Sequence, residues 1–163
     1  MENLLITQKM RRLIVLVLAV MLVGLTGCNK FNQIKLNEAS LEKLTPHGLR
    51  GVDIDMMIEV DNPAMQLKIS DVEVFVKHSG KVLGKVTVDP FIMKARSVEQ
   101  YELKARMVLD EKVTIYDVLM LLNNDFIAKC AVDMTAKGTL RGGLSKTIKK
   151  NDVPLKKLME YAE

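Results

Sequence analysis

The two cysteines are the most nucleophilic side chains of this chain, because a thiolate can be alkylated, acylated or oxidised. Cys28 directly follows Leu25, Thr26 and Gly27 at the end of an apolar run near the N-terminus. Cys130 lies in a segment of alternating residues, with no neighbouring group in sequence that would activate its thiol. We therefore expect covalent modification at Cys28 and predict that Cys130 is a buried, inert thiol.

Patterns that would indicate catalysis or metal binding are missing from the sequence. His47 and His78 stand next to Pro46 and Ser79-Gly80, and no His-x-x-x-His or Cys-x-x-Cys spacing occurs. The chain has neither a Gly-x-Ser-x-Gly elbow nor a glycine-rich phosphate loop before a helix. We predict no catalytic residue, no metal, no cofactor and no enzymatic activity, and we expect both histidines to be solvated turn residues.

Two charged stretches could bind a partner. An acidic stripe on one strand face could meet a cation or a basic partner, although a solvated outer face is the simpler interpretation; it consists of Asp53, Asp55, Glu59 and Asp61. A basic C-terminal region could touch anionic head groups or an acidic partner, and it equally fits a lysine-rich edge strand. It consists of Lys146, Lys149, Lys150, Lys156 and Lys157.

The N-terminal segment has the order of an export signal. Lys9, Arg11 and Arg12 precede eleven apolar residues at 13–23, and small residues follow at 24–27. From residue 13 to Cys28 the stretch has 16 residues, fewer than the ~20 that span a bilayer as a permanent helix. The alternative is an ordinary signal anchor with an incidental cysteine.

Leu-Thr-Gly-Cys at residues 25–28 resembles the lipobox of bacterial lipoprotein precursors. The resemblance implies cleavage between Gly27 and Cys28, a thioether-linked diacylglycerol on Cys28 and acylation of the new N-terminus. Residue 29 is Asn and not Asp, which by the same resemblance implies sorting to the outer membrane, facing the periplasm. Met10 is an alternative start to Met1, and the mature protein is the same in either case.

This interpretation divides the chain into a signal peptide at 1–27, a lipidated tether at 28–33 and a domain at 34–163. Removal of the signal takes away three basic residues and one acidic residue, which leaves 21 Lys+Arg against 19 Asp+Glu. A nearly balanced charge offers no basic footprint for nucleic acid. The expected partners are the membrane, through the lipid, and other envelope proteins, and we expect the domain itself to be monomeric.

Most of the mature chain follows the period-two pattern of strands with one apolar face. Residues 52–60 alternate most clearly, and a phase slip between Leu36 and Ala39 predicts a bulge in the first strand. The other strand candidates cover residues 72–76, 82–88, 101–109, 128–140 and 144–153. The turn signals Ser79-Gly80 and Gly142-Gly143 predict two hairpins.

One segment has helical periodicity. Apolar residues recur at Ile115, Val118, Leu119 and Leu122, Thr114 and Asp117 have the spacing of a capping box, and Asn123-Asn124 is expected to end the helix. About eight strands and one short helix predict a mainly β domain, an antiparallel β-sandwich of the immunoglobulin or fibronectin III type.

Residues 58–63, Ile-Glu-Val-Asp-Asn-Pro, together with the strand and hairpin that follow, resemble the water-stress-and-hypersensitive-response (WHy) domain of the group 2 late embryogenesis abundant proteins. The resemblance covers roughly residues 33–157, including Lys-Gly-Thr-Leu at 137–140 and Val-Pro-Leu at 153–155. It implies a non-enzymatic, membrane-anchored domain that protects or binds other macromolecules under desiccation stress. The alternative is a structural adaptor that docks onto an envelope assembly by adding a strand to a sheet edge.

Four residues of this motif have structural explanations. Pro63 fixes its own φ and favours extended geometry at Asn62, whose side chain we expect to bond its own turn and not a ligand. Gly80 and Gly84 are expected to supply positive φ or a close approach of strands.

Met56, Met107 and Met134 fall on apolar strand faces and are expected to fill the core.

Overall fold

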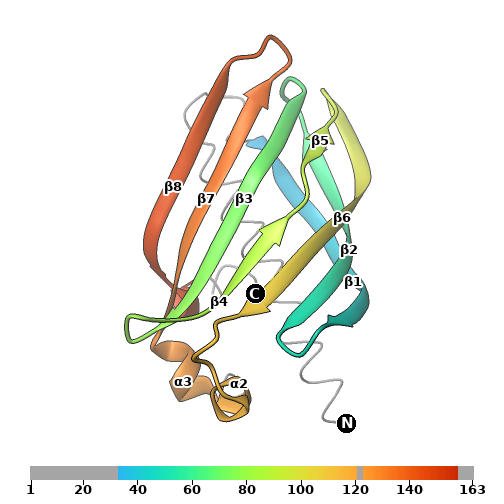
Figure 1. Ribbon diagram of the computed structural model, residues 1–163. Helices are drawn as coiled ribbons and strands as arrows, with labels where there is room; N and C mark the ends of the chain where they lie inside the picture. Colours follow the sequence, from blue (N-terminus) through green and yellow to red (C-terminus); the bar gives the residue numbers. More distant parts are fainter. Residues whose placement is uncertain (1–32, 121–122, 158–163) are drawn as a thin grey trace.

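The computed structural model describes residues 33–120 and 123–157, which form an antiparallel β-sandwich with two short helices (Figure 1). The strands are β1 (Lys35–His47), β2 (Gly51–Asn62), β3 (Leu67–His78), β4 (Lys81–Val88), β5 (Phe91–Met93), β6 (Ser97–Leu109), β7 (Cys130–Leu140) and β8 (Ser145–Pro154). The helices are α2 (Ile115–Met120) and α3 (Asn124–Ala128). The mainly β sandwich predicted from the alternating sequence is therefore confirmed.

The strands are hydrogen-bonded in the order β1-β2-β6-β4-β3-β7-β8, and β5 pairs with β3 beside this path. Strand β4 joins two halves of the sandwich, β1-β2-β6 and β3-β7-β8, because its residues from Gly84 to Val88 pair with β6 as well as with β3. Beyond Val88 the halves separate: β5 continues along β3, and the first part of β6 pairs with β2 alone. Figure 1 shows β8, β7 and β3 on one side of this junction and β6, β2 and β1 on the other.

Strand β3 changes partners at a bulge. Its register against β7 shifts between Ser70 and Glu73, and Asp71 has a positive φ of 52°. Aspartate tolerates this left-handed geometry better than a β-branched residue does. The bend separates the part of β3 that pairs with β5 from the part that pairs with β4.

The core lies between the two halves and is filled by the alternating apolar residues. Ile54, Ile58 and Val60 of β2 are no more than 1% exposed. Residues from β3, β6 and β7 complete the same cluster, among them Val74, Leu103 and Val132. Met56 and Met134 are buried and Met107 packs against the core, as predicted.

The structure adds detail to the predicted strands. The register of β1 against β2 shifts between Leu36 and Glu38, which confirms the expected bulge, and shifts again between Leu41 and Lys43. Both hairpins are present, β3–β4 across Ser79-Gly80 and β7–β8 across Gly142-Gly143. Strand β5 was not predicted, because three residues are too few to establish a period.

The predicted helix is present as α2 (Ile115–Met120), and Leu122, the last apolar residue predicted for it, lies outside the described residues. A second helix, α3, was not predicted. Asn123, which was expected to end the first helix, caps α3, since its Oδ1 accepts a hydrogen bond from the Asp125 N–H at 2.8 Å. Ala128 belongs to α3 and not to the last long strand, which starts at Cys130.

Two ends of the sandwich can be defined by their turns. The tether end holds the start of β1 and the turns at residues 63–66, 94–96 and 141–144, and the helix end holds the turns at 48–50 and 79–80 with the segment 110–129. In Figure 1 the β7–β8 turn and β5 lie at one end, and α2 and α3 lie at the other. Among the helices that the structure describes, none is long and apolar enough to cross a membrane.

The junction through β4 generates a stability prediction. A Cβ built on Gly84 would lie 2.9 Å from the Val108 carbonyl oxygen, which belongs to the β6 backbone and cannot move freely. We expect Gly84→Ala to lower the free energy of unfolding by about 1–3 kcal/mol in urea denaturation. Gly142→Ala is the matched control: nothing lies within 4 Å of its Cβ position, so its change should stay within about 0.5 kcal/mol. Equal effects of the two substitutions would contradict the close approach at Gly84.

Candidate functional site

Asn62 is the buried polar residue of the core, with 0% exposure. Its Oδ1 accepts a hydrogen bond from the Ala64 N–H at 3.0 Å, which closes an Asx turn over Pro63. Its Nδ2 donates to the Met65 carbonyl at 3.1 Å and to the Lys94 carbonyl at 2.9 Å. The predicted bond to its own turn is confirmed, and the amide is fully occupied by the backbone.

The bond from Asn62 to Lys94 joins two turns of the tether end that are 32 residues apart in sequence. A second bond holds the same pair of turns, since the Arg96 N–H donates to the Ala64 carbonyl at 3.0 Å. The Lys94 N–H donates to the Tyr101 hydroxyl of β6 at 2.9 Å, which fixes the 94–96 turn on its own strand. The turns at residues 63–66 and 94–96 are therefore one cross-linked structure. This long-range contact was not predictable from residue types, because the acceptors in the two bonds between the turns, at Lys94 and Ala64, are backbone carbonyls.

The two motif glycines have the expected structural roles. Gly80 has a φ of +82° and follows Ser79 at +49°, so the β3–β4 turn has left-handed geometry at both central residues. Gly84 lies where β4 begins to pair with Leu109 of β6, at the close approach described above. Both residues shape the sheet.

Cys130 is 2% exposed at the start of β7, and its Sγ lies 3.4 Å from the Phe126 carbonyl oxygen. Burial raises the pKa of this thiol to about 11, so it stays protonated at neutral pH. The prediction of a buried thiol is confirmed. Cys28 and the cleavage position at Gly27 lie outside the described residues.

The two histidines differ from each other. His47 is exposed, and its Nδ1 lies 3.5 Å from the Asp53 Oδ2. His78 is not a solvated turn residue: its ring stacks on Phe126 at 3.8 Å between centroids and 4° between planes, and its Nε2 is buried without a hydrogen-bond partner. Sequence reasoning missed this because Phe126 comes from a distant helix. Within residues 33–120 and 123–157, no three His, Cys, Asp or Glu side chains gather to hold a metal ion.

The acidic stripe on β2 faces basic residues across the sheet. Asp53 accepts hydrogen bonds from Arg106 Nε at 2.6 Å and Nη2 at 3.3 Å, and Asp55 lies opposite Lys104 in the strand register. The Arg106 hydrogen bond, with a smaller contribution from the charges of Arg106 and His47, holds the pKa of Asp53 below its ordinary value. All four carboxylates of the stripe are partly exposed, as the simpler interpretation of an outer face expected, and Asp53 among them is paired with Arg106.

A shallow open groove of about 400 Å³ lies over these pairs. Its lining comes from β1, β2, β4 and β6 and mixes both signs of charge; it consists of Thr45, Asp53, Asp55, Thr87, Asp89, Lys104, Ala105 and Arg106. Among its charged residues, Asp53 of β2 and Arg106 of β6 pair with each other.

The basic C-terminal region follows the outer strand. Lys146 and Lys149 are exposed on β8, Lys150 is half-buried, and Lys156 and Lys157 are exposed beyond it. The described part of the chain places no strand on the other side of β8, which pairs with β7. This arrangement matches the lysine-rich edge strand considered in the sequence.

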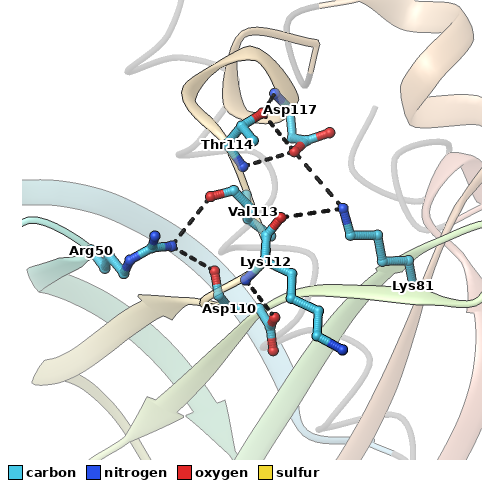
Figure 2. Close-up of polar contacts among 7 residues, drawn as sticks. All are labelled: Arg50, Lys81, Asp110, Lys112, Val113, Thr114 and Asp117. Atoms are coloured by element: carbon cyan, nitrogen blue, oxygen red, sulfur yellow. Dashed lines mark hydrogen bonds and ion pairs between the residues drawn. The ribbon is translucent and has the colours of Figure 1, made fainter.

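A polar network fixes the start of α2 at the helix end (Figure 2). Arg50 Nη1 donates to the carbonyls of Asp110 at 2.8 Å and Val113 at 3.2 Å, which holds the β6–α2 connection against the β1–β2 turn. Thr114 and Asp117 form the predicted capping box, with the Thr114 N–H donating to Asp117 Oδ2 at 2.8 Å and the Asp117 N–H donating to Thr114 Oγ1 at 3.3 Å. The Asp117 carboxylate also lies 3.9 Å from Lys81 Nζ.

Hydrogen bonds from the backbone N–H and hydroxyl of Thr114 lower the pKa of Asp117, so the carboxylate stays ionised at neutral pH. Lys81 Nζ also lies 3.5 Å from the Lys112 carbonyl. The side chains of Arg50 and Lys81 in Figure 2 thus join the segment before α2 to two strand turns. This is a structural network that positions α2.

No protein-family profile matches this chain, and no curated protein matches it in a sequence search. Among solved structures, a protein from Archaeoglobus fulgidus aligns with 10% identity and a TM-score of 0.44, covering 72% of this chain and 97% of that one. The GAE domain of yeast GGA1 aligns with 10% identity and a TM-score of 0.29, covering 73% of this chain and 97% of that one. The fold assignment rests on the strand pairing of this chain itself.

The bonds of Asn62 generate a prediction for the tether end. Asn62→Ala removes two donors and one acceptor and leaves the Met65 and Lys94 carbonyls without their partner, so we expect the free energy of unfolding to fall by about 2–4 kcal/mol. Asn62→Asp should lower the free energy of unfolding more at pH 7 than at pH 4, because at pH 7 a buried, ionised carboxylate would face two carbonyl oxygens. Urea denaturation at both pH values measures the effect. A change in either variant below about 0.5 kcal/mol would contradict the role assigned to Asn62.

Proposed function

We propose that this protein is a lipid-anchored, non-enzymatic domain of the cell envelope that binds or protects other macromolecules, as the resemblance to WHy domains implies. The lipobox at residues 25–28 supplies the anchor. The observation that carries the proposal is the position of Ile34, which is 8% exposed and belongs to the core cluster six residues after Cys28. The folded domain thus begins almost at the proposed site of lipidation.

The geometry of the tether follows from that position. Five residues separate Cys28 from Ile34, so a fully extended tether reaches roughly 20 Å. A domain held this closely acts at the membrane surface and meets partners by collision or docking there. An outer-membrane location facing the periplasm remains part of this proposal.

The distribution of polar groups supports a binding role. Ion pairs lie on the exposed faces, for example Lys85 of β4 to Glu73 of β3 at 2.8 Å, and Lys94, in the turn before β6, to Glu99 of β6 at 3.0 Å. Each exposed ion pair of this kind adds little to the free energy of unfolding. Together such pairs keep the surface soluble and mixed in charge. Such a surface suits weak contacts with many clients.

The anchor can be tested by metabolic labelling with an alkyne analogue of palmitate. We expect the intact chain to incorporate the label and to sediment with membranes, and Cys28→Ala to lose both properties. Cys130→Ala is the matched control, because it removes the other cysteine, which is buried and protonated. Labelling that survives in Cys28→Ala, or disappears in Cys130→Ala, would refute the assignment.

A second candidate function is docking by strand addition, and the outer edge of β8 favours it. Near its C-terminal end β8 is held by Lys77, whose Nζ lies 3.0 Å from Asp133 and 2.5 Å from Asp152. The half of β8 next to the β7–β8 turn carries no such clamp. An added strand would therefore pair along residues 145–150.

The β7–β8 ladder shows which backbone groups face outward. The Leu140 N–H donates to the Leu144 carbonyl at 2.8 Å, so this is a hydrogen-bonded pair. Hydrogen-bonded pairs alternate with non-hydrogen-bonded pairs along an antiparallel ladder. In the continuing register Lys137 pairs with Thr147 as a non-hydrogen-bonded pair, so the Thr147 N–H and carbonyl point away from β7.

Thr147→Pro tests this candidate, because it removes an outward N–H and leaves the β7–β8 ladder intact. If an envelope protein docks by strand addition, we expect the variant to lose a partner that co-purifies stoichiometrically after detergent extraction. Thr147→Val keeps the N–H and should retain the partner. Equal recovery of the partner with both variants would exclude this edge.

A further inference from the structure

Exposed apolar side chains gather at the tether end. Seven large hydrophobic residues of the described chain are exposed, and four of them belong to this end: Met65 at 54%, Ile92 at 47%, Val98 at 57% and Leu144 at 72%. Single exposed apolar residues are ordinary on a protein surface, but a group at one end indicates a contact.

Strand register brings these four residues together. Ile92 pairs with Lys68, one residue from Leu67, which pairs with Leu140 at the start of the β7–β8 turn that carries Leu144. Met65 lies in the turn that the Asn62 amide ties to the turn at residues 94–96. Val98 pairs with Asp61, which in turn pairs with Lys35 at the beginning of β1. The apolar tips and the point where the chain enters the sandwich thus share one end.

The charge of these turns has one sign. The segments 63–66, 94–96 and 141–144 contain Lys94, Arg96 and Arg141 and no acidic residue. Lys94 pairs with Glu99, and no ion pair among the described residues involves Arg96 or Arg141. Basic residues beside exposed apolar side chains match a bilayer surface, where anionic head groups lie above the acyl chains.

The length of the tether selects the end that meets the membrane. Strand β2 runs from one end of the sandwich to the other over 12 residues, a length of roughly 36 Å at the usual rise per residue. The tether reaches roughly 20 Å from Ile34. An upright domain can therefore place its tether end, and not its helix end, against the bilayer.

We propose that the three turns of the tether end, together with the adjoining ends of β5 and β6, form a second membrane contact: Met65, Ile92, Val98 and Leu144 enter the head-group region, and Arg96 and Arg141 bind anionic lipid heads. This inference rests on the proposed lipid anchor, and it adds an orientation to it. The sandwich stands on the membrane and presents α2, α3 and the 48–50 turn to the periplasm. The outer edge of β8 then lies along the side of the domain, accessible to partners.

Fluorescence quenching in vesicles tests the contact with the full lipidated protein. Leu144→Cys and Met65→Cys each introduce a thiol for a small fluorophore, and Leu49→Cys, in the helix-end turn and 104% exposed, is the matched control. Cys130 does not react, because it is buried and its pKa is raised. The vesicles contain phosphatidylethanolamine, phosphatidylglycerol and a doxyl lipid whose spin label lies near the head groups.

We expect strong quenching of the labels at positions 65 and 144 and none at position 49. Arg96→Glu with Arg141→Glu should reduce quenching at position 65 to about half or less in these vesicles, but not in vesicles of phosphatidylcholine alone. Retained circular dichroism and urea midpoint show that each variant is folded.

Mass spectrometry of the N-terminal peptide in the same samples separates the two proposals. Anchored protein with no quenching at positions 65 and 144, or with equal quenching at position 49, overturns the contact and leaves the anchor standing. Capture of a protein by a photocrosslinker at position 144, without quenching, overturns it in favour of a protein interface. If the N-terminal peptide carries no lipid, both the anchor and the membrane contact are overturned.

Discussion

The side chain of Asn62 is the constraint on which the tether end depends. It lies in the core with 0% exposure, and its three hydrogen bonds are made to the backbone of two turns. A buried amide is tolerated only when its donors and acceptor are satisfied, so the bonds and the burial require each other. Pro63 restricts the backbone just after it, and the turns at 63–66 and 94–96 become a single rigid unit. That unit carries Met65 and Arg96, two of the residues that we place against the membrane.

Sequence alternation was sufficient for the fold because most strands have one buried and one exposed face. Of the five apolar residues at even positions of 52–60, Ile54, Met56, Ile58 and Val60 are buried, and Val52 packs against the core while partly exposed. The β1 bulge was also predictable, since a slip of one residue moves side chains to the other face and leaves a visible phase change. The capping box at Thr114 and the two hairpin turns were predictable for a similar reason, because each depends on residues within a few positions of one another.

Contacts between distant segments were not predictable from local patterns. The bond from Asn62 to Lys94 uses a carbonyl that every residue type possesses, and the stacking of His78 on Phe126 joins β3 to α3. Helix α3 was missed because Asn is favourable both after a helix and at the cap before one, and five residues are too few to establish a helical period. The gathering of Met65, Ile92, Val98 and Leu144 at one end likewise depends on strand order, which alternation leaves undetermined.

An orientation on the membrane is the central claim, and hydrogen–deuterium exchange of the lipidated protein tests it most directly. The backbone amides of each segment would be compared between anionic vesicles and detergent micelles, with the anchor present in both. The account predicts slower exchange in vesicles at residues 63–66, 91–98 and 141–144, and unchanged exchange at 48–50 and 110–117. Protection confined to the helix end, or no difference at the three tether-end turns, would contradict it.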